Sequence, residues 1–251
     1  MCRKPNTILL EDSSKMIGYK LASSNSCNVI VTLRIPNDSK TNINRSDIVD
    51  KKYAKYRTNK ATIIDIEDMD GNKYNNAVSS VYTKKKIQYI THETITEENY
   101  NEDVNIVCGE GIHFFIDKEA SIYYGTTPPL FNGEFKKWWD NGQLLKKATY
   151  VNGNLHGEYK EWWSNGQLTF YAPYINGKLH GEHKRWYPNG QLHLQITYVN
   201  GLIHGEYKEW YENGQPHTQA ILLDGTSWKG YKRWNPNGEL DYVDGILLEE
   251  N

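Results

Sequence analysis

Cys108 and His113 are the residues whose types and spacing first suggest catalysis, within "VCGEGIHFFIDKEASIYYG" (107–125). A cysteine nucleophile needs a neighbouring imidazole to take the thiol proton. In an extended chain the two residues would lie about 16 Å apart, whereas proton transfer needs about 3 Å. Gly109 and Gly111 could fold the segment back. The alternative interpretation is a buried cysteine at the entrance of a core strand, without a catalytic role.

Three histidines, His156, His180 and His204, recur every 24 residues and raise the question of a metal site. If the units are successive hairpins, equivalent side chains lie two strands apart, which is about 9.5 Å. The ligands of one zinc ion must each lie within about 2.1 Å of it. The histidine column therefore cannot bind one ion, and we expect neither a metal nor a cofactor.

The stretch "KKYAKYRTNK" (51–60) interleaves cationic residues with tyrosines, a pattern that could suit a phosphate-bearing partner. The whole chain, however, contains 29 basic and 31 acidic residues, and Asp47 and Asp50 flank the stretch. Nucleic acid and anionic membranes need a field of one sign. We therefore favour a solvated helix face here and an exposed turn at 84–86, with no nucleic-acid partner. The charge gives no support for membrane association.

The elements that would position these residues are mixed in the first half of the chain. Short β-rich runs predict strands at 28–36, 61–74, 79–83, 87–93 and 112–116. A helix capped by Ser46 is expected over 47–56, and another capped by Asp117 follows the last strand. After an N-terminal tail at 1–15, residues 16–125 are therefore predicted to form a small α+β domain.

The second half is a repeat with a period of 24 residues. All 8 tryptophans lie between Trp138 and Trp234, and a linker with two prolines at 126–132 precedes them. Five units begin at 133, 157, 181, 205 and 229 and extend to 245, and a tail at 246–251 follows. Each unit carries an Asn-Gly pair after its tryptophan, and the first three carry a second Asn-Gly half a period later. Such pairs predict two-residue hairpin turns with both residues at positive φ. The array is therefore predicted as an all-β, single-layer antiparallel β-meander of 24-residue hairpins.

The aromatic residues of each unit fall into two columns. The column Trp138, Trp162, Trp186, Trp210 and Trp234 is predicted to form the core, where stacked hairpins bring the rings into register. The adjacent column contains Trp139, Trp163, Tyr187, Tyr211 and Asn235. Because neighbouring residues of a strand face opposite ways, this second column is predicted to lie on an exposed face, together with Phe135, Tyr159 and Tyr207. That face is our candidate protein-binding surface.

Residues 131–245 resemble MORN repeats, in a variant that stands here as "YVNGNLHGEYKEWWSNGQL" and "YVNGLIHGEYKEWYENGQP". The resemblance implies an elongated, twisted sheet that binds proteins or lies near membranes. It implies no catalytic residue.

The front half, at "GYKL" (18–21), "LRIP" (33–36), "YAKYRTNKA" (53–61) and "CGEGIHFF" (108–115), resembles an uncharacterised domain of giant DNA viruses. A second likeness is to ADP-ribosyltransferases, in which a "GxGIYF…A…Y" strand lines the nicotinamide pocket. The matching residues are Gly109, Gly111, Ile112, Phe114, Ala120 and Tyr123 or Tyr124. His113 and Phe115 depart from that pattern, and the chain has no clear partner motif.

We therefore expect a non-enzymatic protein-binding or structural protein of viral origin. The alternative is an enzyme, ADP-ribosyltransferase-like, with its site around Cys108–His113. Three widely spaced cysteines, no signal-peptide pattern and no long apolar run predict an intracellular, soluble protein in the host cytoplasm or the virion.

Overall fold

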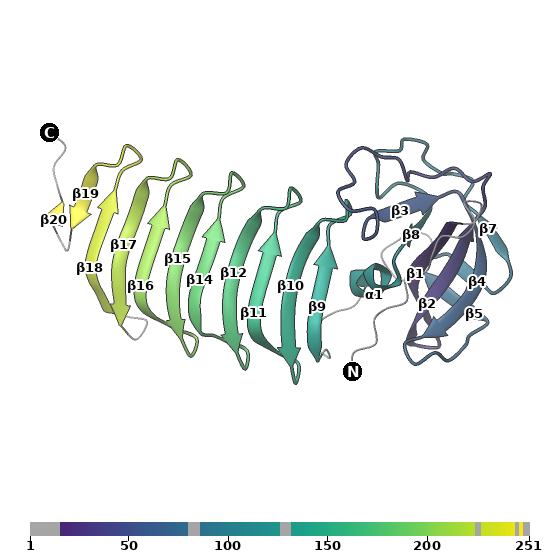
Figure 1. Ribbon diagram of the computed structural model, residues 1–251, viewed down its shortest axis with the longest axis horizontal. Helices are drawn as coiled ribbons and strands as arrows, with labels where there is room; N and C mark the ends of the chain where they lie inside the picture. The colour runs from purple at the N-terminus through teal and green to yellow at the C-terminus, as the bar shows by residue number, and fades with distance from the viewer. Residues whose placement is uncertain (1–15, 80–85, 126–131, 224–226, 244–245, 248–251) are drawn as a thin grey trace. The chain divides into compact units, whose positions relative to one another are not determined.

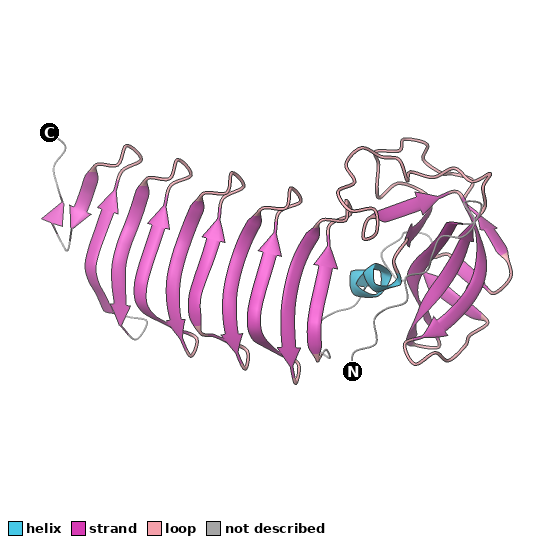
Figure 2. Cartoon of the chain, in the orientation of Figure 1, coloured by secondary structure: helices cyan, strands magenta, loops and turns pink. Residues whose placement is uncertain are grey.

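The structure is a computed structural model that describes residues 16–79, 86–125, 132–223, 227–243 and 246–247. The chain divides into two compact units. The first contains residues 1–125 together with 140–142, and the second contains 126–139 and 143–251. The tail predicted at 1–15 lies outside the described residues. So do residues 126–131 of the predicted linker, residues 80–83 of the strand predicted at 79–83, and residues 84–85 of the turn predicted at 84–86. Figures 1 and 2 show that strands dominate both units.

The first unit is an antiparallel sheet with one short helix among its described residues. Its strands run in the order β3-β8-β1-β2-β4-β7, and β5 pairs with β1 and β6. The elements are β1 (Met16–Ser24), β2 (Cys27–Ile35), β3 (Lys55–Thr58), β4 (Lys60–Asp68), β5 (Asn76–Ser79), β6 (Gln88–Ile90), β7 (Thr94–Thr96), β8 (Ile112–Phe115) and α1 (Lys118–Gly125). The predicted α+β class is therefore wrong for this domain, which is β-rich.

The helix predicted over 47–56 does not form. The segment turns until Ala54, and the chain then enters β3, which pairs along its whole length with β8. This pairing buries Tyr56 completely, because its ring packs 5.8 Å from that of Phe114 in the core. Partners far away in the sequence have overridden a local helical pattern. The second predicted helix does form, and the Asp117 carboxylate caps it by accepting a hydrogen bond from the Ala120 amide at 3.2 Å.

The second unit is an antiparallel meander in which each long strand pairs with the long strands before and after it in the sequence (Figure 1). Its strands are β9 (Gly133–Trp138), β10 (Leu144–Val151), β11 (Asn154–Trp162), β12 (Leu168–Ile175), β13 (Lys178–Leu179), β14 (Gly181–Trp186), β15 (Leu192–Val199), β16 (Leu202–Trp210), β17 (Pro216–Leu223), β18 (Ser227–Trp234), β19 (Leu240–Val243) and β20 (Ile246–Leu247). The last strand, β20, pairs with β19, so the sheet continues into the predicted tail.

The two turns of each repeat use their Asn-Gly pairs differently. At the tight turns, such as Asn152-Gly153, both residues have positive φ, 51° and 75°, as a two-residue hairpin requires. At the wide turns, such as Asn165-Gly166, only the glycine does, with a φ of 87°. There the Asn165 side chain instead accepts a hydrogen bond from the Gln167 amide at 3.0 Å. The prediction of two-residue turns at both places is therefore wrong for the wide turns, because a three-residue turn with a bulge fits the same dipeptide.

The sheet has two chemically different faces. One face, which we call the charged face, presents pairs of glutamate and lysine two residues apart on a strand. These include Glu158–Lys160 at 2.7 Å and Glu206–Lys208 at 2.8 Å. The other face, which we call the aromatic face, contains Phe135, Ala148, Tyr150, Tyr159, Phe170, Ala172, Tyr174, His183, Ile196, Tyr198, Tyr207 and Ala220.

Large and small side chains alternate across the aromatic face. Tyr159 pairs with Ala148 on one side and with Ala172 on the other, and both alanines are completely buried. The Tyr159 ring also packs at 5.4 Å, edge to face, against Phe170. Each ring thus covers the alanine of the neighbouring strand, which allows a single layer to bury apolar surface without a second sheet.

This packing corrects the predicted core. Among the column of tryptophans only Trp138 reaches burial, at 9% exposed, and the others are half-buried. Phe135, predicted to lie on an exposed face, is 2% exposed. The prediction is wrong because the register shifts between Glu161 and Trp162, so simple alternation cannot be carried through the end of the strand.

Candidate functional site

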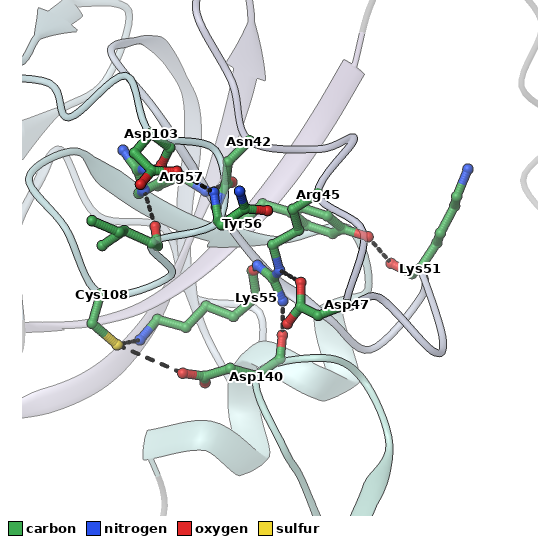
Figure 3. A network of polar contacts seen from close by, with 12 residues as sticks. Asn42, Arg45, Asp47, Lys51, Lys55, Tyr56, Arg57, Asp103, Cys108 and Asp140 are labelled. Atoms are coloured by element: carbon green, nitrogen blue, oxygen red, sulfur yellow. Dashed lines mark hydrogen bonds and ion pairs between the residues drawn. The ribbon is translucent and has the colours of Figure 1, made fainter. Parts of the chain in front are cut away.

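The structure does not join Cys108 to His113 by a hydrogen bond. His113 Nε2 lies 3.1 Å from the main-chain oxygen of Val107. The exposed Cys108 Sγ lies instead 3.6 Å from Lys55 Nζ and 3.6 Å from an Asp140 carboxylate oxygen, within the first unit (Figure 3). The predicted thiol–imidazole pair is therefore replaced by a thiol beside an ammonium group.

His113 is surrounded by cationic groups. Burial lowers its pKa to about 3, and the charges of Lys55, Lys20 and Arg57 add to the effect. The imidazole is therefore neutral at neutral pH. Its Nε2–H donates to the Val107 carbonyl, so this nitrogen cannot accept a thiol proton.

The lysines of this region differ in their electrostatics. Burial and the charge of Lys55 lower the pKa of Lys20 to about 8. Burial opposes the charge on Lys55 as well, but Asp140 and Tyr124 outweigh it and raise the pKa of Lys55. The Lys55 ammonium donates to the Tyr124 hydroxyl at 2.7 Å. Lys55 is thus a buried ammonium group whose charged form is stabilised by Asp140 and Tyr124.

Arg57 is the largest fully buried side chain among the described residues. Its side chain is completely buried and donates to the main-chain oxygens of Asn101, Asp103, Ile106 and Glu110. The bond from Nε to Ile106 measures 2.6 Å. One guanidinium therefore binds four main-chain oxygens of the loop before β8, and Figure 3 shows Asp103 of this loop beside Arg57.

The prediction of a solvated helix face at 51–60 is wrong for Lys55 and Arg57. Both lie on β3, where they are 8% and 0% exposed. The signal available in the sequence is the alternation of cationic residues with Tyr56, which has the period of a strand. Over so short a run, this alternation does not distinguish a strand from a helix.

The ADP-ribosyltransferase-like segment forms β8 and α1. Ile112 and Phe114 are buried in the hydrophobic core of the sheet, where Phe114 packs on Tyr56. Tyr124 directs its hydroxyl to Lys55. Ile112 and Phe114 thus serve the packing of the domain.

In the repeats, the candidate column Trp139, Trp163, Tyr187 and Tyr211 lies at the wide turns, just beyond the strand ends. Three of its members donate a hydrogen bond to the carbonyl of the tryptophan in the next repeat, each at 2.9 Å: Trp139 to Trp162, Tyr187 to Trp210, and Tyr211 to Trp234. The Nε1 of Trp163 is buried without a hydrogen-bond partner. The column therefore joins successive repeats to one another.

Removing one of these bonds is expected to loosen the array. Tyr187→Phe keeps the ring and deletes only the donor to the Trp210 carbonyl, so the free energy of unfolding should fall by about 1 kcal/mol. Urea unfolding followed by tryptophan fluorescence measures the loss. Tyr171→Phe, whose exposed hydroxyl contacts Glu158 at 3.4 Å, is the control. Equal effects of the two changes would contradict a joining role for Tyr187.

Tyr159 and Tyr207 lie on the aromatic face, where they are half-buried. Burial raises the pKa of both, to about 12 for Tyr207, and Glu161 and Glu209 contribute. The recurring His156 and His180 each have a buried Nδ1 without a hydrogen-bond partner. Within the described residues, no three His, Cys, Asp or Glu side chains are placed to hold a metal ion. Nor does any helix in those residues have the length and apolar character to cross a membrane.

Comparison with protein families agrees with the division into two units. Residues 6–121 match a family of unknown function, DUF5758. Residues 131–152, 155–176, 179–200 and 203–221 match the MORN repeat variant. No curated protein matches the chain. MORN repeats thus follow a DUF5758 domain, and the hairpin of β18 and β19 lies beyond the matched segments.

Proposed function

We propose that this protein is a non-enzymatic MORN-repeat module that binds protein through the aromatic face of its sheet. The observation that carries the proposal is the contrast between the two faces. Glutamate and lysine neutralise one another on the charged face. The aromatic face instead presents half-buried tyrosines, the side chains that most often anchor protein interfaces.

The contacts of the front domain support this proposal over the enzymatic alternative. Cys108 and His113 have separate partners, and the neutral His113 donates to the main chain. Two of the residues that resemble ADP-ribosyltransferases, Ile112 and Phe114, are buried in the core. We further infer a giant-virus origin, on the likeness of the front half to a viral domain.

Two neighbouring residues of β15 allow a matched test of the binding face. Leu194 pairs with Arg185 and Glu209 on the aromatic face, whereas Gln195 pairs with Lys184 and Lys208 on the charged face. Tagged full-length protein carrying Leu194→Lys should capture at least about tenfold less of its protein partners than the parent protein. The reason is that a lysine in an apolar contact must be desolvated. Gln195→Lys, the same change on the opposite face, should retain them.

Affinity capture with quantitative mass spectrometry gives the comparison, and tryptophan fluorescence checks that both variants are folded. Equal capture by the two variants would show that the aromatic face is not the binding face. Loss of capture in the Cys108→Ser variant, with capture retained in Leu194→Lys, would instead favour a site in the front domain.

A further inference from the structure

The aromatic face carries a row of charges whose sign alternates from one repeat to the next. The residue before each repeat's tryptophan is, in order, Lys137, Glu161, Arg185, Glu209 and Arg233. Their strand partners and ring contacts place these side chains on the aromatic face: Glu161 pairs with Phe170, Phe170 with Arg185, and Leu194 with Glu209. Successive charges lie two strands apart, which is about 9.6 Å.

The central charges of the row lack full partners within the chain. Arg185 is exposed, with its guanidinium 5.4 Å from the Phe170 ring centroid, and no ion pair or hydrogen bond joins its side chain to another described residue. Glu161 accepts a hydrogen bond from the Tyr159 hydroxyl and lies opposite Lys146, which sits over the Tyr159 ring at 4.5 Å.

The later charges of the row have polar partners inside the array. Arg233 pairs with Asp241 at 2.7 Å, and Glu209 lies 3.0 Å from His217. Glu161 on β11 and the exposed Arg185 on β14 therefore lie on either side of Phe170.

A two-fold rotation makes this row complementary to itself when the axis lies along a strand that separates opposite charges. With the axis along β12, Glu161 of each copy meets Arg185 of the other, and Lys137 meets Glu209. Phe170 then meets its own counterpart at the axis. With the axis along β14, by contrast, Arg185 would meet Arg185 and Glu161 would meet Glu209. Like charges in contact oppose association strongly, so the row selects the first register against the second.

We propose that the aromatic face binds a second copy of this chain face to face, with the two-fold axis along β12 and two Glu161–Arg185 pairs across the interface. Sheets pack face to face with their strands within about 30° of alignment. Aromatic rings around Phe170 then form the centre of the contact, which favours the axis along β12 over one along β15, and the charges exclude the axis along β14. This inference rests on the proposed function, because it names the partner of the same face.

Charge exchange tests the register directly. Sedimentation velocity of the full-length protein should show a dimer that dissociates on dilution and weakens with added salt. Glu161→Arg and Arg185→Glu should each weaken dimerisation by at least about tenfold, since both symmetric pairs become repulsive. An equimolar mixture of the two single variants should form a heterodimer as tight as the parent dimer, and the double variant should recover the homodimer.

Lys184→Glu is the matched control, because it makes the same change one residue away on the charged face and should leave the dimer intact. A folded parent protein that remains monomeric at about 100 µM overturns the inference. Rescue of Arg185→Glu by Glu209→Arg, and not by Glu161→Arg, also overturns it, because that result places the axis along β15.

The two proposals fail separately. If the protein is monomeric but Leu194→Lys still abolishes its capture of other proteins, only the proposed self-association is wrong. If the protein is monomeric and Leu194→Lys leaves its capture of other proteins unchanged, the proposed binding function of the aromatic face is wrong as well.

Discussion

Arg57→Met is expected to destabilise the first unit by about 3 kcal/mol or more, the largest effect of any single change in that domain. The methionine fills similar space but leaves the carbonyls of Asn101, Asp103, Ile106 and Glu110 without their donor in a buried setting. Each buried polar group left unsatisfied costs about 1–3 kcal/mol. Hydrogen exchange of the amides in residues 101–110 should therefore accelerate before that of the rest of the domain.

Arg57→Lys should restore little of this stability, because an ammonium cannot reproduce the planar fork of a guanidinium. Arg34→Met, on an exposed position of β2, is the control and should leave exchange unchanged. The tryptophans all lie between Trp138 and Trp234, so their fluorescence should not report the loss. If the loop kept its protection in Arg57→Met, the assigned role of the guanidinium would be wrong.

His183→Phe is expected to remove most of the acid sensitivity of the repeat array. His183 is 5% exposed, both of its ring nitrogens lack a hydrogen-bond partner, and the Phe170 and Tyr198 rings lie against it. Burial, and then the charge of Arg185, lower its pKa from 6.5 to about 4. The equivalent position of the first repeat is Phe135, which shows that a phenyl ring fits this column.

The direction of the pH effect follows from that shift. A histidine whose pKa is lower in the folded state gives its full stability above pH 6.5 and loses it as the pH falls towards 4, because the unfolded state binds the proton first. The loss should reach about 3 kcal/mol near pH 4. Urea unfolding between pH 7 and pH 4, followed by tryptophan fluorescence, measures it.

His204→Phe, at an exposed position of the same array, provides the comparison and should retain the acid loss of the parent. The same loss in His183→Phe as in the parent would mean that another group controls the acid response.

The repeat half of this chain was predictable because its signals are local and recur. Turn residues at fixed spacing define the hairpins, and a hairpin specifies its own partner strand. The identity of the buried face was not predictable by alternation alone, since a bulge separates Glu161 from Trp162 in the register. The alanines at 148 and 172 were the better indicator, because only a small residue fits beneath a neighbouring ring.

The front domain was less predictable because its decisive contacts join distant segments. Tyr56 is buried by pairing with Phe114, and Arg57 binds a loop more than 40 residues later in the chain. The same separation explains the candidate site. Cys108 and His113 are close in sequence, but the side chain that reaches Cys108 is Lys55, on another strand.

The bond from Tyr187 to the Trp210 carbonyl has an evolutionary consequence. Its donor and acceptor lie one repeat apart, and the same bond runs from Tyr211 to Trp234. Each copied hairpin would therefore carry a donor for the unit after it and an acceptor for the unit before it. A gene duplication in steps of one period can therefore lengthen the protein without any compensating substitution. Selection can then adjust the length of the array without changing the side chains on its faces.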